Sequence, residues 1–281
     1  MYVLWSVLSA LLYGAADFAG GLATRRSNVE SVIILSQIAG ACLALGFIVA
    51  TQTALPGPLT IVWSLAAGAS GLVGLATLYR GLARGVVAIV SPVSALVAAL
   101  LPALFGIASG ERPSALAMAG ALLCIPAILF LSWQPKGDSD KRRSRLSIID
   151  GLVAGAGFGC FFIALSRTGH DDGLWPVAFA RLASLFLMIA IALIGRRGVR
   201  VPKGSRRLAI VAGFADMGAN ILFLLATRSG LLSIVSVISS LFPAPTVLLA
   251  RVFQKERIPP LRALGLVMAL AGVALIGIKG Q

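Results

Sequence analysis

Charged side chains are scarce in this sequence, and that scarcity is the first constraint on the kind of protein it encodes. Only 12% of the 281 residues are Asp, Glu, Lys or Arg, whereas 58% are hydrophobic and the mean hydropathy is +0.97. Soluble domains carry about 25% charged and about 45–50% apolar residues. The composition therefore excludes a water-soluble globular protein and predicts an integral membrane protein.

Histidine and cysteine are also few, which bears on metal and disulfide chemistry. The one histidine, His170, lies with Asp171 and Asp172 in a short loop, and a metal site would need more ligands than this loop offers. The three cysteines all fall inside long apolar runs: Cys42, Cys124 and Cys160. An odd number of thiols at membrane depth indicates neither a disulfide framework nor a metal cluster. We expect no metal site and no cofactor.

Enzyme motifs are missing as well. The sequence has no HExxH motif and no phosphate-binding loop, and its glycine-rich stretch GAGFGC at 155–160 lies within an apolar run. In that run Gly151, Gly155 and Gly159 share one helical face, which predicts close packing of helices. We therefore expect a protein that is not an enzyme.

Long apolar runs are what the sequence has in abundance. Runs of about 20 residues, separated by breaks rich in charge, proline and glycine, predict ten membrane-spanning helices. The expected ranges are 3–23, 31–51, 59–81, 86–107, 115–133, 148–167, 174–194, 207–228, 231–252 and 260–278. The runs are apolar throughout and do not alternate, which favours helices over strands. No basic segment precedes the first run, so we expect residues 1–23 to remain as a spanning helix.

The two halves of the chain resemble each other at an offset of 145 residues. Residues 85–120 and 230–265 share 12 identities in 36 positions, where about four would arise by chance in so apolar a composition. We expect a first five-helix repeat at 1–133, a basic cytoplasmic linker at 134–147 and a second repeat at 148–278. Because five is odd, the second repeat must enter the membrane from the opposite side. The predicted fold is an all-α integral membrane protein whose ten transmembrane helices form two inverted five-helix repeats.

The two copies carry the clearest family resemblance in the chain. GVVAIVSPVSALVAALLPALFGIASGERPSALAMAGALL at 85–123 and GLLSIVSVISSLFPAPTVLLARVFQKERIPPLRALGLVMALAGVALIGI at 230–278 resemble the EamA family of the drug/metabolite transporter superfamily. The resemblance implies ten helices in two repeats, and transport of amino acids, drugs or other metabolites. In both copies a Glu-Arg pair, at residues 111 and 112 and at residues 256 and 257, follows the fourth helix. We expect a hydrophilic turn there, with a gating role as the alternative.

Basic residues indicate how the chain is oriented. Of the 24 Lys and Arg residues, 19 lie in loops after odd-numbered helices and four lie on the other side. We expect a multi-pass plasma (inner) membrane protein. Because cytoplasmic loops retain Lys and Arg, both of its termini are predicted to be non-cytoplasmic. The family resemblance instead implies that both termini lie in the cytoplasm. The net charge of +14 suggests contact with anionic lipid headgroups. No aromatic residues interleave the basic loops, so no nucleic-acid partner is expected.

Three ionisable residues stand out well inside the predicted helices, at membrane depth, where a charge is costly and marks a candidate site: Asp17, Arg181 and Asp216. A membrane carboxylate can take and release a proton during transport, and Arg181 could hold a substrate carboxylate or phosphate. The alternative is structural, with Arg181 paired to one of the aspartates, or Asp17 to nearby Arg25. A salt bridge that protonation breaks would satisfy both interpretations.

Smaller polar groups complete the candidate site. Asn220 is one turn from Asp216, and Tyr13 is one turn from Asp17. Four serines occupy equivalent points of the two repeats: Ser91, Ser94, Ser236 and Ser239. They could line a central cavity or bond back to their own helices. Four prolines interrupt the fourth and ninth helices, as binding-site breaks or as plain kinks: Pro92, Pro102, Pro243 and Pro245.

Several functions fit this sequence. The first is a secondary active transporter that exports amino acids, related small metabolites or drugs by alternating access, with proton coupling through Asp17 or Asp216. The second, motivated by Arg181, exchanges phosphorylated metabolites or lipid carriers. A third, of a different class, is a membrane scaffold or enzyme that moves nothing. The expected partner is a small-molecule substrate, and the protein could be a monomer or a homodimer.

Overall fold

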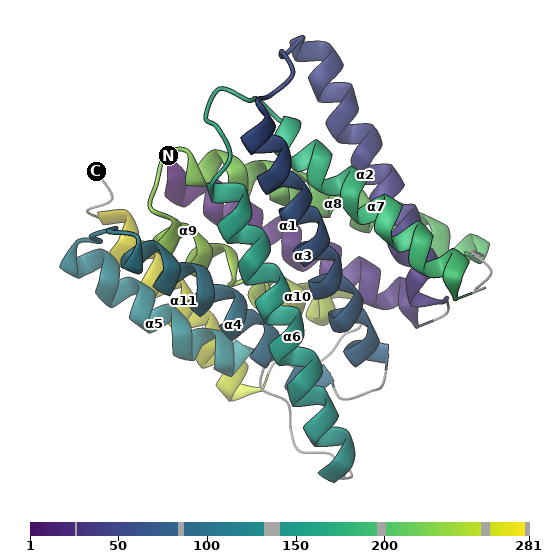
Figure 1. The fold of residues 1–281 in the computed structure, drawn as a ribbon. Helices are drawn as coiled ribbons and strands as arrows, with labels where there is room; N and C mark the ends of the chain where they lie inside the picture. The colour runs from purple at the N-terminus through teal and green to yellow at the C-terminus, as the bar shows by residue number, and fades with distance from the viewer. Residues whose placement is uncertain (26, 84–86, 132–140, 196–200, 254–258, 279–281) are drawn as a thin grey trace.

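The structure is a computed structural model that describes residues 1–25, 27–83, 87–131, 141–195, 201–253 and 259–278. All regular structure within these residues is helical (Figure 1). The helices, in chain order, are α1 Tyr2–Thr24, α2 Val29–Thr51, α3 Pro58–Ala83, α4 Val87–Ala108, α5 Ala115–Leu131, α6 Lys141–Ser166, α7 Trp175–Ile194, α8 Lys203–Thr227, α9 Leu232–Ser239, α10 Pro243–Phe253 and α11 Pro260–Ile278. Every predicted span corresponds to a helix or, for the ninth, to a pair.

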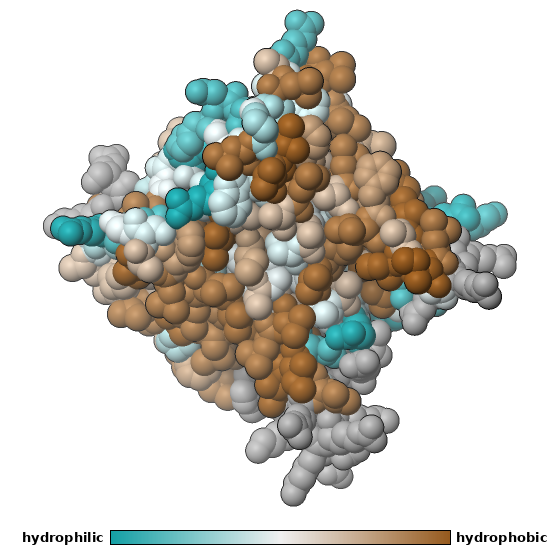
Figure 2. All heavy atoms as spheres, viewed as in Figure 1, coloured by the Kyte–Doolittle hydropathy of each residue, from teal (hydrophilic) through white to brown (hydrophobic). Residues whose placement is uncertain are grey.

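The surface has the character of a membrane protein. Eight segments, with α9 and α10 counted together, are long and apolar enough to cross a bilayer, and α5 and the described part of α4 are shorter apolar helices. Large hydrophobic side chains point outward around the bundle, among them Val49, Ile194 and Leu270. Figure 2 shows one such face, mainly hydrophobic across its middle, with hydrophilic residues gathered toward its ends. The all-α membrane fold is confirmed.

The predicted ninth helix is broken. α9 ends at Ser239 and α10 begins at Pro243, because a proline ring fits the first turn of a helix but blocks continuation of the one before it. α1 packs against this break, where the hydroxyl of Thr246 donates to the carbonyl of Gly14 at 3.1 Å. α4 differs, since it runs unbroken past its two prolines. The break is therefore confined to the second half.

Two helices begin earlier than hydropathy predicts. α6 starts at Lys141 instead of at 148, so the end of the predicted basic linker is already helical. α8 starts at Lys203 instead of at 207. Lys and Arg are good helix formers, so a helix can extend past its apolar part. The rest of the linker, 134–140, lies outside the described residues.

The closest helix packing joins the first half of the chain to the second. α1 packs on α8 as α6 packs on α3, and α2 packs on α8 as α7 packs on α3. In the predicted repeat, α6, α7 and α8 are the counterparts of α1, α2 and α3. Replacing each helix by its counterpart turns the α1–α8 pair into the α6–α3 pair, and the α2–α8 pair into the α7–α3 pair. α5 and α11, which correspond to each other, also pack together. This is the pairing that a two-fold repeat would give.

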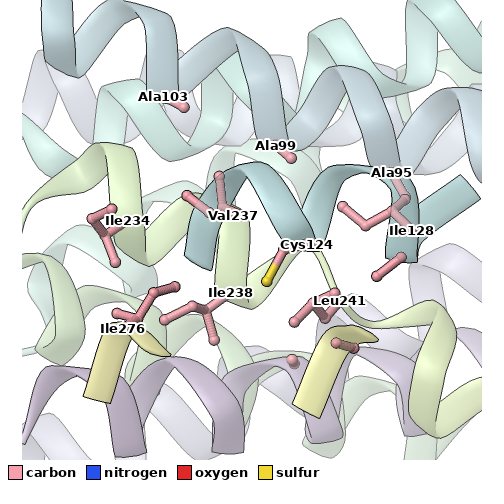
Figure 3. Close-up of a cluster of buried hydrophobic side chains, with 14 of the residues drawn as sticks. Ala95, Ala99, Ala103, Cys124, Ile128, Ile234, Val237, Ile238, Leu241 and Ile276 are labelled. Carbon is pink, nitrogen blue, oxygen red and sulfur yellow. The ribbon is translucent and has the colours of Figure 1, made fainter. Parts of the chain in front are cut away.

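Glycines allow the close approach of α6 to α4. A Cβ added at Gly151 would lie 2.8 Å from Val93, and at Gly155 it would lie 2.6 Å from the Ser94 carbonyl. A Cβ at Gly159 would lie 2.8 Å from Leu101. The glycine face that the sequence indicated is thus a packing face. A neighbouring apolar cluster fills the space between α4, α5, α9 and α11, with Cys124 and Ile128 among its members (Figure 3).

Polar contacts also join the halves. The carboxylate of Glu111, in the turn after α4, accepts the backbone N–H groups of Leu232 and Ser233 at 2.8 and 2.9 Å, at the start of α9. Gly106 leaves room for this carboxylate, because a Cβ there would lie 2.4 Å from it. The Glu-Arg turn of the first half is therefore a helix cap. Its counterpart at residue 256 lies outside the described residues.

Candidate functional site

A cavity lies between the helices of the two halves. Its lining comes from α1, α2, α3, α6, α7, α8 and the break after α9: Tyr13, Asp17, Gln37, Gly71, Leu75, Phe158, Phe161, Phe162, Val177, Ala180, Arg181, Ser184, Asp216, Asn220 and Phe242. The centres of water molecules can occupy a volume of about 60 Å³ inside it. One water needs about 10–15 Å³ of such volume, so the cavity has room for several waters.

Arg181 of α7 is held by two other helices. Its guanidinium donates to the side-chain oxygen of Gln37 on α2 and forms an ion pair with Asp216 on α8. Only 5% of the Arg181 side chain is exposed, against 26% of the Asp216 side chain. Gly40 of α2 makes room for this guanidinium, since a Cβ there would lie 3.0 Å from its Nε. The structural interpretation, in which Arg181 pairs with an aspartate, describes this arrangement.

Asn220 extends the network toward α1. Its side-chain Nδ2 donates to the backbone carbonyl of Asp216 at 2.8 Å and to the Asp216 carboxylate at 3.2 Å. The hydroxyl of Tyr13 donates to Asn220 Oδ1 at 2.6 Å. A chain of hydrogen bonds thus runs from Gln37 through Arg181 to Tyr13, and it fixes the position of the Asp216 carboxylate.

Asp17 stands apart from this network. It lines the same cavity from α1, one turn beyond Tyr13. In the described part of the chain its carboxylate has neither a hydrogen-bond partner nor an ion-pair partner, and no ion pair joins it to Arg25. A cavity carboxylate without a partner is available to a proton or to a solute, which makes Asp17 the unpaired carboxylate of the site.

Aromatic side chains form much of the remaining wall. Phe162 stacks on Phe223 with ring centroids 4.1 Å apart, and it lies 6.0 Å from Tyr13 and 5.8 Å from Phe161. Phe242 reaches the lining from the break between α9 and α10. The cavity therefore combines apolar rings with a few polar groups, which is typical of sites for small organic molecules.

The four serines predicted from the repeat do not line this cavity. Ser94 and Ser239 are fully buried, and in the described part of the chain their hydroxyls have no partner. Ser236 is also fully buried, and its hydroxyl donates to the carbonyls of Ala99 on α4 and Ser233 on its own helix at 3.5 and 3.3 Å. Ser91 is partly buried in α4. Of the nine candidates, the structure brings together the other five: Tyr13, Asp17, Arg181, Asp216 and Asn220.

Sequence reasoning gave little weight to the rest of the lining. Gln37 is difficult to single out from the sequence, because nothing in an apolar run shows which face meets the centre of the protein. Phe158, Phe161 and Phe162 carry a usable signal, since spacings of three and four place them on one face of α6. Ser184 donates to the Gly68 carbonyl at 2.7 Å and so joins α7 to α3.

A second polar cluster lies at one end of the bundle, outside the spans. Arg228, after α8, donates to the carbonyls of Gly169 and Gly173 at 3.1 and 2.7 Å. Partial burial lowers the pKa of Arg228, and the nearby carboxylates of Asp172 and Asp171 oppose that shift. These contacts fasten the loop after α6 to the end of α8. The described residues contain no cluster of three or more metal-ligating side chains.

Comparisons with known proteins bear on the family and the fold. Residues 145–278 match the model of the EamA-like transporter family. A crystal structure resembles the whole chain with a TM-score of 0.80 and 19% sequence identity, over 99% of this chain and 98% of that chain. Identity this low indicates a shared fold and nothing more specific. No curated protein matches the chain.

Proposed function

We propose, from the match of residues 145–278 to the EamA-like transporter family, that this chain is a secondary active transporter that exports small amine-bearing metabolites or drugs, amino acids included. That match supports membrane transport as the function of the chain. The direction of transport, the substrate and the energy source are the finer parts of the proposal. No ATP-binding motif occurs in the sequence, so an ion gradient or substrate exchange would supply the energy.

The observation that carries the proposal is a polar cavity shared by both halves. Tyr13, Asp17 and Gln37 come from the first half, whereas Arg181 and Asp216 come from the second. In alternating access, two inverted repeats rock against each other around a site at their interface. The matched helix pairs support such a repeat. One chain encloses the cavity, so a monomer would be sufficient.

Asp17 is the proposed coupling residue. Arg181 and Asn220 already engage the Asp216 carboxylate through an ion pair and a hydrogen bond. Asp17 has no such support, so a proton can bind there without breaking a contact. In the proposed cycle Asp17 is protonated on one side of the membrane and deprotonated on the other.

The alternative of a phosphorylated substrate finds less support. It relied on a guanidinium free to bind an anion, whereas Arg181 is engaged by Gln37 and Asp216. An incoming phosphate would have to displace the Asp216 carboxylate and would then face Asp17 as well. Efflux of a labelled sugar phosphate that requires external phosphate would favour this alternative.

Export can be tested by an extracellular metabolite profile. Cells that overproduce the intact protein are compared with cells that produce Asp17→Asn at the same membrane level, a change that preserves side-chain shape. We expect at least one amine-bearing compound to accumulate outside only with the intact protein. Identical profiles would contradict export.

Coupling is tested with that compound loaded into liposomes. An imposed pH gradient should accelerate efflux through the intact protein severalfold, and efflux indifferent to the gradient would contradict proton coupling.

A further inference from the structure

We propose that the cavity selects a solute with net positive charge and an aromatic or apolar body. This inference rests on the proposed transport function. It narrows the substrate class from all amine-bearing compounds, zwitterionic amino acids included, to compounds with a net positive charge. It follows from the charged side chains of the lining, from the engagement of Arg181 by other residues of the protein and from the aromatic walls of the cavity.

The lining has more carboxylates than basic side chains. Its ionisable side chains include the carboxylates of Asp17 and Asp216 and the guanidinium of Arg181. Arg181 and Asp216 cancel in an ion pair, so the Asp17 carboxylate, once deprotonated, has no counter-charge in the lining. In a site bounded by apolar helices an uncompensated carboxylate attracts a cation far more strongly than it would in water. The same charge repels an anion.

Among the residues that line the cavity, no cationic side chain is free to hold a substrate carboxylate. The Arg181 side chain is almost fully buried, and its guanidinium donates to Gln37 and Asp216. A zwitterion such as an amino acid would satisfy Asp17 with its ammonium group but would place its carboxylate near Asp216 without a counter-charge. A cation without a carboxylate avoids that repulsion, so charge alone favours an amine over the corresponding amino acid.

The walls suit a cation with an apolar body. Five aromatic side chains line the cavity: Tyr13, Phe158, Phe161, Phe162 and Phe242. The faces of aromatic rings attract cations, and the attraction is larger when water is excluded. The rings also bury the apolar part of a solute. Asp17 thus supplies the charge contact, and the aromatic wall supplies contact area.

A series of compounds with the same ring and different charges tests the inference. Phenethylamine is a cation, phenylalanine a zwitterion and 3-phenylpropionate an anion. Binding of each to the purified full-length protein is measured by titration of its intrinsic fluorescence in detergent. We expect phenethylamine to bind at least about tenfold more tightly than phenylalanine, the difference that one charge-assisted contact supplies, and 3-phenylpropionate not to bind.

The matched variants are Asp17→Asn and Asp171→Asn. Asp171 is an exposed loop residue outside the cavity. Asp17→Asn should remove the preference for the cation, whereas Asp171→Asn should preserve it. The wild-type series does not depend on either variant folding. Equal or tighter binding of phenylalanine or 3-phenylpropionate would overturn the inference, as would binding of none of the three.

Flux of the same compounds in liposomes separates this inference from the proposed function. Selective binding of phenethylamine without flux would support the cation site and contradict transport. Flux that favours phenylalanine or 3-phenylpropionate would support transport and contradict the cation site. Flux that favours phenethylamine and depends on Asp17 would support both.

Discussion

At the residue scale, Arg181 and Asp216 depend on each other. A buried ion pair can be neutral in net stability, yet removal of one partner leaves a charge without compensation. Arg181→Met should therefore lower the free energy of unfolding by about 3 kcal/mol, because it strands Asp216 in the cavity. The double variant Arg181→Met with Asp216→Leu should recover most of that loss. Thermal unfolding of the purified variants in detergent measures both changes.

The outcome that contradicts this interpretation is equally specific. A double variant no more stable than Arg181→Met alone would mean that lost packing of the arginine side chain, and not the stranded carboxylate, causes the instability. Gln37→Leu serves as a milder comparison, since it removes a neutral acceptor of Arg181 and leaves the ion pair in place.

Some residue roles were predictable and others were not. Asp17, Arg181 and Asp216 stood out because charge is rare in an apolar helix. Which of them would pair was not predictable, because it depends on how α7 and α8 are rotated. A helix that is hydrophobic all round carries no polar stripe to reveal that rotation. The four serines illustrate the same limit of sequence analysis. Their equivalent positions in the repeat suggested a shared cavity, but none of them lines it.

At the scale of elements, Glu111 connects the turn after α4 to the start of α9. Glu111→Ala removes the acceptor of two backbone N–H groups at a helix N-terminus and should cost about 1–2 kcal/mol of stability. Glu111→Gln keeps one acceptor oxygen and should cost less. Arg112→Ala, at the exposed neighbouring position, should change stability by less than about 0.5 kcal/mol.

Chemical unfolding of these variants in detergent supplies the measurement. If Arg112→Ala proved as destabilising as Glu111→Ala, the turn as a whole and not the carboxylate cap would carry the stability.

Helix positions were the most predictable feature of the elements. Hydropathy placed α11 at 260–278, the range that the structure shows. It misjudged the starts of α6 and α8, where charged residues continue a helix beyond its apolar part. It also treated the prolines of α4 and the ninth span alike. Two prolines separated by one residue, at 243 and 245, end one helix and begin another, whereas α4 accommodates prolines spaced ten residues apart.

At the scale of the whole molecule, the distribution of basic residues makes a prediction about orientation. Both termini should lie outside the cytoplasm, and the linker at 134–147 should lie inside, because cytoplasmic loops retain Lys and Arg. Reporter enzymes that are active only outside the cytoplasm, fused to either end, should be active. The same reporter inserted in the linker should be silent, and the reverse pattern would contradict the predicted orientation.

The pairing of helices across the two halves also bears on how the protein is made. α1 packs on α8, α3 on α6 and α5 on α11. In each of these pairs the helix from the first half is synthesised before its partner. Until the later helices enter the membrane, the faces that bear Asp17 and Gln37 must meet lipid or other early helices. The order of synthesis and the order of packing therefore differ, and the cavity can close only after the second half has been inserted.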